Sequence, residues 1–179
     1  MIRYHDEEWG IPVRDDARHF EFMILESAQA GLSWATVLRK RDGYRKAFAD
    51  FDVQRVARFN SRSVERLVND ASIIRNRQKI EAAINNARRF TEIQSEFGSF
   101  SEYVWGFVGG RPIVNRWKEQ SDVPATSKES DELSRDLKAR GFKFVGSTIV
   151  YAHMQAAGLV NDHVTACFRF RETTQGSAR

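Results

Sequence analysis

The sequence has few of the residues that stabilise secreted or membrane proteins. Cys167 is its single cysteine, so no disulfide can form within the chain, and an unpaired thiol is typical of a reducing compartment. We therefore expect a cytoplasmic protein. No run of about eighteen apolar residues occurs, which is the length that a membrane-spanning helix requires. The N-terminus carries charges where a signal peptide needs an apolar run, so we expect no membrane insertion.

The net charge and the overall composition exclude few classes of function. Lysine and arginine number 28 against 24 aspartates and glutamates, a formal charge of +4 that favours polyanionic partners only weakly. Apolar residues make up 41% of the 179 positions, too many for an extended disordered chain and enough for one continuous core. We predict one domain over residues 1–171 and a flexible polar tail over residues 172–179.

Apolar residues recur at helical spacing, and no segment keeps the period of two that marks a half-buried strand, so we predict an all-α fold. Residues 17–30 are apolar on nearly every face, which predicts a helix buried on several sides and ended by Gly31. Thr126 and Glu129 match a capping box that would begin a later helix, and Gly141 stands where that helix would end. The other predicted segments are a helix capped by Asp52, helices at 64–68, 80–87 and 147–157, a helix or strand at 100–108, and a loop at 109–125.

The helix predicted at residues 17–30 carries a carboxylate, Glu26, into surroundings of low polarity. An unpaired charge there costs several kcal/mol, so something must compensate it. Trp34 follows closely, and Tyr4 and Trp9 stand among the first ten residues. A carboxylate beside aromatic faces suits a flat cationic ligand. A glutamate bound by backbone or hydroxyl donors, or one that points outward at the helix edge, fits the same pattern, so both interpretations stay open.

A basic segment lies at residues 67–80, where two apolar-faced stretches flank a polar break at residues 69–72. The second stretch begins at Ile73, so the pattern predicts two helices joined by a tight turn. Free N–H groups at a helix N-terminus suit a phosphate, and such a hairpin would hold DNA without reading its sequence. An ordinary helical hairpin fits equally well, and Ser72 stands where a DNA-binding hairpin usually prefers glycine. The cations that would contact phosphate are Arg75, Arg77 and Lys79.

The histidines and the cysteine suggest a metal site. His163 and Cys167 are four residues apart, a spacing that would place both on one helix face and would suit zinc. His5 offers a third ligand from the other end of the chain. A structural zinc normally takes four protein ligands, so spacing alone favours a buried thiol beside hydrogen-bonded histidines. His19 and His153 lie in helical runs and are expected to be packing or surface residues.

Several motifs stand in order along nearly the whole chain. They are YHDEEWGIP at 4–12, LESAQAGLSW at 25–34, IIRNRQKI at 73–80, RGFKFVGSTIVYAHMQAAGLVNDH at 140–163, and the closing Cys167-Phe168-Arg169. Together they resemble the 3-methyladenine DNA glycosylase I family, a branch of the helix-hairpin-helix glycosylases. A set of long motifs in fixed order is far more specific than any one of them.

The resemblance implies a fold, a pocket and a DNA-facing surface. The fold would be a monomeric, helix-hairpin-helix glycosylase-like helical bundle, with its hairpin at about residues 64–88 and its N- and C-terminal segments packed together as a small lobe. Glu26 corresponds to the carboxylate of the base pocket and Trp34 to the ring that stacks on the damaged base. The further pocket walls would be Tyr4 and Trp9, and the residues at the DNA surface near the lesion would be Gly31 and Leu32.

The resemblance also implies a structural zinc ion that joins the two ends of the chain. Three residues match its ligands in the family: His5, His163 and Cys167. The fourth ligand of the family is a cysteine upstream of the YHD motif, and the four residues before His5 include no cysteine. The sequence therefore supplies three of the four implied ligands.

By this resemblance we expect a DNA repair enzyme that hydrolyses the N-glycosidic bond of 3-methyladenine in double-stranded DNA containing alkylated bases. It would release free 3-methyladenine and leave an abasic site. Methylation at N3 makes adenine cationic, so Glu26 and Trp34 would chiefly recognise a base that already leaves easily. No lysine can be assigned to the pocket as a Schiff-base nucleophile, so we expect no strand cleavage.

Three alternatives remain. The chain would be a non-catalytic, DNA-binding helix-hairpin-helix protein if the short N-terminus impairs the pocket. It would excise a different base if the pocket has another shape. It would be a metalloenzyme if His5, His163 and Cys167 hold a metal with an open water position.

Overall fold

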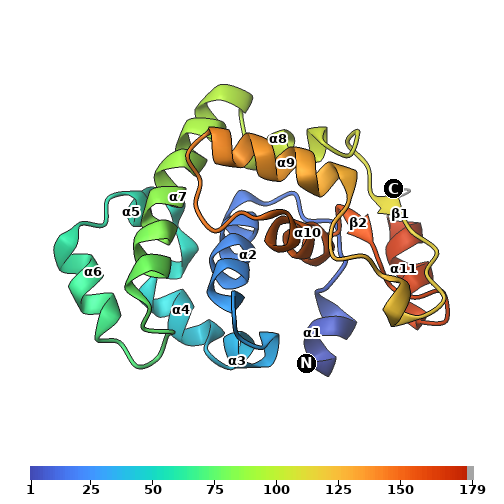
Figure 1. Cartoon of the computed structure of the whole chain (residues 1–179), viewed down its shortest axis with the longest axis horizontal. Coiled ribbons are helices and arrows are strands. Elements are labelled where there is room, and N and C mark those ends of the chain that lie inside the picture. Colours follow the sequence, from blue (N-terminus) through green and yellow to red (C-terminus); the bar gives the residue numbers. More distant parts are fainter. Residues whose placement is uncertain (177–179) are drawn as a thin grey trace.

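The computed structural model describes residues 1–176, and in this range the chain is almost entirely helical (Figure 1). The prediction of an all-α fold is confirmed. Every helix in this range is too short or too polar to span a bilayer. The helices are α1 (Ile2–Glu7), α2 (Asp16–Gln29), α3 (Trp34–Arg39), α4 (Arg41–Ala47), α5 (Val53–Ala57), α6 (Ser61–Val68), α7 (Arg77–Phe97), α8 (Phe100–Gly106), α9 (Lys128–Ala139), α10 (Ser147–Ala156) and α11 (Phe168–Gly176). Two short 3₁₀ turns, η1 (Ala49–Phe51) and η2 (Gln120–Asp122), and two-residue strands β1 (Ile113–Val114) and β2 (Val160–Asn161) complete this part.

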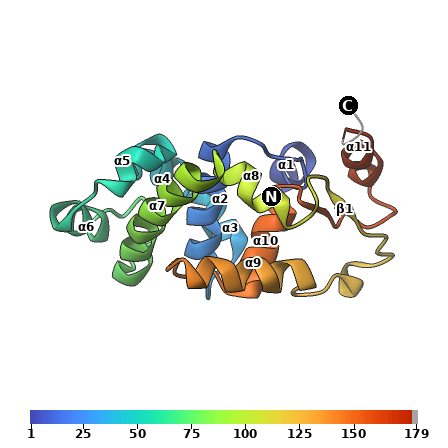
Figure 2. The same cartoon turned by 90° about the horizontal axis from the view of Figure 1, so that it is seen from above.

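Helix α2 lies at the centre of the molecule and contacts α3, α7, α8 and α10 (Figures 1 and 2). The Asp15 carboxylate caps its first turn by accepting a hydrogen bond from the Arg18 N–H. Every residue from His19 to Ala28 is buried, because neighbours cover the helix on all sides. The helix ends before Gly31, whose φ of +78° suits a residue without a side chain. The prediction for this helix is confirmed, and its full burial carries Glu26 into the core.

The C-terminal end of α2 is held by Lys79, from the first turn of α7. The Lys79 ammonium donates hydrogen bonds to the carbonyls of Ala28 (2.9 Å) and Ala30 (2.6 Å). The last carbonyls of a helix have no partner within the helix and carry its negative dipole end, so a cation stabilises them. Lys79 therefore fixes the chain one turn beyond Glu26.

The connection between α6 and α7 differs from the predicted tight turn. The second helix begins at Arg77 rather than Ile73, because the Asn76 side chain accepts a hydrogen bond from the Lys79 N–H and sets the cap there. Ile73 is buried but not helical. An apolar residue at helical spacing can be buried either within a helix or just before it. The capping residue Asn76 therefore predicts the start of α7 better than the apolar Ile73 does.

Helix α9 also begins one residue later than predicted. Ser127, not Thr126, is the N-cap, and its capping-box partner is Ser130 rather than Glu129. This register lets the small Ser130 hydroxyl reach the Ser147 hydroxyl (2.8 Å) on α10. The helix ends before Gly141 as predicted. Residues 100–106 form a helix, and the predicted loop at 109–125 contains β1 and η2.

The two ends of the chain meet on one side of α10. β1 and β2 pair in parallel, with Ile113 opposite Val160, and the Val13 N–H donates to the Ala157 carbonyl (2.9 Å). Figures 1 and 2 show α1, β1 and α11 at the same end of the molecule, opposite α6. The predicted small lobe is therefore present. Helix α11 continues to Gly176, beyond the predicted domain end, and residues 177–179 of the predicted tail lie outside the described residues.

Candidate functional site

A pocket of about 360 Å³ opens between the N-terminal segment, the end of α2, and the C-terminal lobe. Its walls include Glu26 together with all three aromatic residues predicted to bind a base. Cavities of this size take a small planar molecule. The lining residues are Met1, Tyr4, His5, Trp9, Glu26, Gln29, Trp34, Gln120, Ala152, Gln155, Asp162, His163, Val164 and Cys167.

Glu26 is a carboxylate without a partner. Its side chain is 5% exposed, and no described residue forms a hydrogen bond or an ion pair with it. Burial raises the pKa of Glu26 to about 8, because removal from water penalises the charged form. Neither alternative from the sequence holds: Glu26 does not point outward, and no backbone or hydroxyl donor in the described chain satisfies it. A ligand that brings positive charge would compensate this carboxylate.

Tyr4 and Trp34 form an aromatic corner beside Glu26. Their ring centroids lie 5.4 Å apart and their planes meet at 54°. The Tyr4 hydroxyl and the Trp34 indole N–H are buried, and neither has a hydrogen-bond partner in the described part of the chain. Burial, and next the nearby Glu26 charge, raise the pKa of Tyr4, so the phenol stays protonated. Two aromatic side chains thus line the pocket beside the unpartnered Glu26, and a flat ligand can pack against their rings.

Trp9 links the pocket to a histidine cluster. Its ring lies 6.1 Å from the His5 ring in a stacked arrangement and meets the His163 ring edge-on at 4.6 Å. The Trp9 carbonyl accepts a hydrogen bond from the His163 Nε2 (3.2 Å). Trp9 therefore lines the pocket as predicted, and it also packs against both His5 and His163.

Three potential metal ligands, His5, His163 and Cys167, converge at this cluster. Their ligand atoms all lie within 4.8 Å of one another, with Cys167 Sγ 3.6 Å from His5 Nε2 and 3.7 Å from His163 Nδ1. The predicted shared helix face is wrong, because the chain is irregular at residues 162–164, turns at 165–167 and enters α11 only at Phe168. The turn, rather than helical periodicity, brings the two residues together.

The outer nitrogens of both histidines are already engaged. His163 Nε2 donates to the Trp9 carbonyl, and His5 Nδ1 donates to the Asp6 carboxylate (2.7 Å). A neutral imidazole carries one N–H, so these bonds leave lone pairs on His163 Nδ1 and His5 Nε2 beside the Cys167 sulfur. Histidines that bind zinc are oriented by hydrogen bonds of this kind. The donor set and its orientation therefore fit zinc.

The predicted DNA contacts fall into two groups. Gly31 and Leu32 form the exposed turn between α2 and α3, and Leu32 leaves 43% of its surface open to solvent. Arg75 is exposed and has no partner within the described residues. Arg77 instead binds Glu65 (2.8 and 3.0 Å), and Lys79 caps α2. The structure thus separates one free cation from two that stabilise the fold.

A family model for methyladenine glycosylases matches residues 1–170. The chain belongs to the methyladenine glycosylase family.

Similar proteins of known name support this assignment. DNA-3-methyladenine glycosylase 1 of Escherichia coli (strain K12) is 51% identical over 166 residues, which cover 93% of this chain and 89% of that protein. A crystal structure of 3-methyladenine DNA glycosylase I superposes with a TM-score of 0.91 at 49% identity, covering 93% of this chain and 92% of that one. A variant of 3-methyladenine DNA glycosylase I, solved in complex with 3-methyladenine, gives a TM-score of 0.91 at 37% identity over 93% and 90% of the two chains.

One important residue of this methyladenine glycosylase escaped sequence reasoning. Asp162 is 1% exposed and accepts hydrogen bonds from four side chains, which fixes the backbone just before His163. Its place directly before His163 in the sequence was the one sign that Asp162 matters. The side chains that donate to it lie in two other segments of the chain, so the sequence could not predict these hydrogen bonds. The donors are Asn115 (2.7 Å), Trp117 (2.8 Å), Tyr151 (2.6 Å) and Gln155 (2.8 Å).

The Glu26→Gln variant should be more stable than the parent, by a margin that grows as pH rises. The pKa of Glu26 is about 8 in the fold and about 4.3 in an unfolded chain. Between these values the folded state holds a proton that the unfolded state releases, so the parent loses stability as pH rises, and glutamine removes this loss. Urea unfolding at pH 5 and pH 8 should show the margin widening by at least about 1 kcal/mol.

The exposed Glu102→Gln on α8 is the matched control and should show no such widening. A margin for Glu26→Gln that stays constant between the two pH values would contradict the raised pKa of this carboxylate.

Proposed function

We propose that this chain is a DNA repair glycosylase that hydrolyses the N-glycosidic bond of 3-methyladenine in double-stranded DNA. The observation that carries the proposal is the pocket in which the buried, unpartnered carboxylate of Glu26 faces the rings of Tyr4 and Trp34. Family membership and relatives named as 3-methyladenine glycosylases support it, and one such relative was solved with 3-methyladenine bound.

The pocket favours a cationic purine over a neutral one. Methylation at N3 gives adenine a positive charge that the Glu26 carboxylate can neutralise, and charge-assisted hydrogen bonds are stronger than neutral ones. The faces of Tyr4 and Trp34 attract a flat cation in addition. Unmodified adenine can still stack, but it carries no positive charge to displace the proton from Glu26, whose pKa is about 8 without a ligand, so it gains no charge-assisted hydrogen bond. Selection therefore rests on the charge of the damaged base.

Hydrolysis requires little further catalytic machinery. The alkylated base departs as a neutral molecule, so the enzyme needs chiefly to extract it from the duplex, at a cost of a few kcal/mol, and to hold it where water reaches the sugar carbon. Leu32 stands on the exposed turn beside the pocket and can fill the gap that the base leaves. None of the described residues that line the pocket is a lysine, which favours hydrolysis without a covalent Schiff base.

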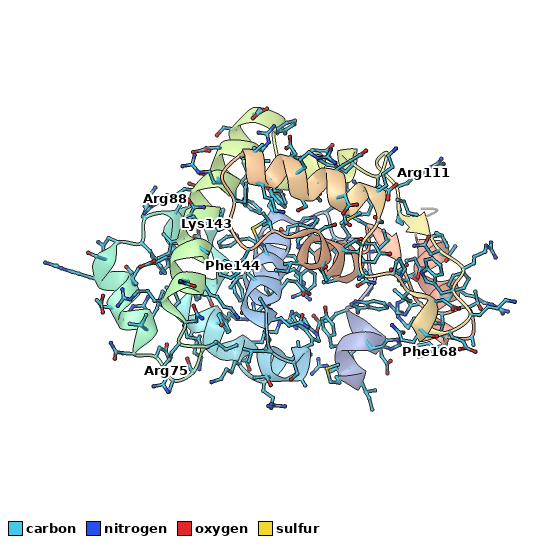
Figure 3. All side chains as sticks on the ribbon, in the orientation of Figure 1. Arg75, Arg88, Arg111, Lys143, Phe144 and Phe168 are labelled. Atoms are coloured by element: carbon cyan, nitrogen blue, oxygen red, sulfur yellow. The ribbon has the colours of Figure 1, made fainter. Side chains whose placement is uncertain are left out.

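DNA would lie across the side of the molecule that presents the turn at Gly31 and Leu32. Arg75, before α7, and Lys143, between α9 and α10, are exposed cations whose charged groups have no partner in the described chain (Figure 3). The Asn86 side chain bonds the Lys143 backbone N–H and carbonyl (2.8 Å each), so the Lys143 loop is held against α7. Both cations suit contacts with the phosphate backbone.

Zinc would hold the two ends of the chain together. We propose that His5, His163 and Cys167 bind it, since their lone pairs already converge. Structural zinc takes four donors, so one further donor completes the site. The ion would anchor the N-terminal segment that carries Tyr4 and would take no part in bond cleavage.

Release of free 3-methyladenine from methylated double-stranded DNA tests the activity. The parent should release the base and leave alkali-sensitive abasic sites, and Glu26→Gln and Trp34→Ala should each lower kcat/KM by about tenfold or more. Glu102→Gln should match the parent. No release by the folded parent would refute the proposal, and a protein–DNA adduct trapped by borohydride would refute simple hydrolysis.

The salt dependence of binding to undamaged DNA tests the proposed DNA surface. Arg75→Gln and Lys143→Gln should each weaken binding and reduce the slope of log affinity against log salt concentration by about 1. Arg111→Gln, a similarly exposed arginine at the other end of the molecule (Figure 3), is the control. If the salt slopes of Arg75→Gln and Lys143→Gln equalled that of Arg111→Gln, the DNA would not contact Arg75 or Lys143.

Metal analysis tests the zinc site. The purified chain should contain one zinc per molecule, and a strong chelator should lower its Tm. Cys167→Ser should lose most of the metal. Metal-free protein held below its Tm should still cleave the glycosidic bond, whereas complete loss of cleavage in folded, metal-free protein would favour a metalloenzyme. A chain purified without zinc, and indifferent to chelator, would exclude the site.

A further inference from the structure

The segment that joins α6 to α7, residues 69–76, is held against the start of α4 by two hydrogen bonds. The Lys40 ammonium donates to the Ala71 carbonyl (2.7 Å), and the Ile74 N–H donates to the Tyr44 hydroxyl (3.3 Å). Lys40 is the N-cap residue of α4, and Tyr44 lies in its first turns. The beginning of this one helix therefore positions the middle of the segment.

Gly43 lies between these two bonds and approaches Ser72 so closely that a side chain does not fit. A Cβ atom at position 43 would lie 2.3 Å from the Ser72 carbonyl oxygen, 2.9 Å from its carbonyl carbon and 2.8 Å from its Cβ. Cβ atoms essentially never come within 3.0 Å of such neighbours. Two of the three atoms belong to the backbone, which cannot rotate away as the end of a side chain can. Any larger residue at position 43 must therefore move the segment or α4.

Ser72 is fixed on its other side by Asp70. The Ser72 N–H donates to the Asp70 carboxylate (2.8 Å), and hydrogen bonds from the Ser72 hydroxyl and N–H hold the pKa of Asp70 below its ordinary value. The Ile73 N–H donates to the Asp70 carbonyl (3.4 Å), and the Ile73 side chain is buried. These residues form one closed turn, so a displacement of Ser72 would move the turn as a whole.

The turn leads directly to Arg75, the exposed cation before α7 (Figure 3). The backbone is fixed on both sides of Arg75. Ile74 before it is bound to α4, and Asn76 after it caps α7 by accepting a hydrogen bond from the Lys79 N–H (3.1 Å). The Asn76 N–H also donates to the Ile74 carbonyl (2.9 Å). A shift of the turn at Ser72 is therefore transmitted to Arg75 over only three residues.

We propose that Gly43 is a positioning residue for the DNA-facing segment, because the absence of a side chain there lets Ser72 pack against α4 and holds Arg75 where it contacts a phosphate. The effect on DNA rests on the proposed function, whereas the packing of Gly43 against Ser72 does not. Ser72 stands where a DNA-binding hairpin usually prefers glycine. In this chain the glycine on α4 supplies the room that a glycine in the turn would otherwise supply.

Two substitutions and their combination test this pair. Gly43→Ala introduces the overlap with Ser72. Ser72→Gly removes one of the overlapping atoms and lets the backbone turn its carbonyl away, since glycine adopts conformations that other residues do not. The double variant should therefore recover what Gly43→Ala loses. Gly106→Ala on α8 is the matched control, because a Cβ on that helical glycine would meet no atom of the described residues within 4 Å.

Thermal unfolding tests the packing itself and needs neither DNA nor activity. Gly43→Ala should lower the Tm by about 3 °C or more, and the double variant should recover at least half of that loss. Gly106→Ala should keep the Tm of the parent or raise it slightly. An unchanged Tm in Gly43→Ala, or losses that simply add in the double variant, would overturn the proposal. If Gly43→Ala does not fold, a folded double variant supports the pair and an unfolded one overturns it.

Binding measurements on the folded variants test the positioning role. Gly43→Ala should bind undamaged double-stranded DNA about threefold or more weakly, and its slope of log affinity against log salt concentration should fall as that of Arg75→Gln does. The double variant should recover both. The affinity of Gly43→Ala for the permanently cationic base 3,9-dimethyladeninium should stay close to that of the parent, because Gly43 lies outside the base pocket.

The combined results separate failure of this inference from failure of the proposed function. A lower Tm with unchanged DNA affinity in Gly43→Ala, while Arg75→Gln binds DNA more weakly, would show a purely structural role and overturn the inference alone. Unchanged DNA affinity in both variants would refute the proposed DNA surface and, with it, the positioning role. Recovery of the Tm in the double variant would then support only the packing of Gly43 against Ser72.

Discussion

The burial of Glu26 without a counter-charge is the constraint on which the rest of the structure depends. A carboxylate in apolar surroundings is costly, and it is retained only if the surrounding packing holds it there. Helix α2 is therefore fixed at both ends, by the Asp15 cap and by the Lys79 ammonium on its last carbonyls. Its faces are covered on every side. The burial of Glu26 costs stability, and we propose that a cationic base bound in the pocket recovers part of it.

Glu21, a second buried glutamate on α2, shows how ion-pair partners change the pKa of a buried carboxylate. Glu21 is 3% exposed, yet it forms ion pairs with Arg18, Arg41 and Arg45. Burial alone would raise the pKa of Glu21, but its bonds to Arg41 and Arg18 outweigh burial and hold that pKa below its ordinary value. Glu21 thus ties α2 to α4, whereas Glu26 has no partner among residues 1–176. The opposite pKa shifts of Glu21 and Glu26 indicate different roles, with Glu21 as a structural ion-pair residue and Glu26 as the candidate ligand-binding residue.

The sequence predicted local features well where a strong local signal was present. The limits of α2, the end of α9 at Gly141 and the pocket set of Glu26, Tyr4, Trp9 and Trp34 follow from periodicity, glycine placement and motif resemblance. Periodicity alone could not place the start of α7, since Ile73 is buried without being helical. Nor could spacing distinguish Lys79 and Arg77, which have protein partners, from Arg75, which has none within residues 1–176. Those assignments depend on contacts between segments far apart in the chain, such as Ala28 with Lys79.

The central claim is that a buried carboxylate selects a purine by its positive charge, and proton release on binding tests it most directly. Calorimetric titrations near pH 7, in two buffers of different ionisation enthalpy, would compare 3,9-dimethyladeninium with neutral 9-methyladenine. Since the pKa of free Glu26 is about 8, the cation should bind tightly and release most of one proton, while the neutral purine should bind weakly and release none. Equal affinity for the two purines, with no proton released by either, would contradict the account.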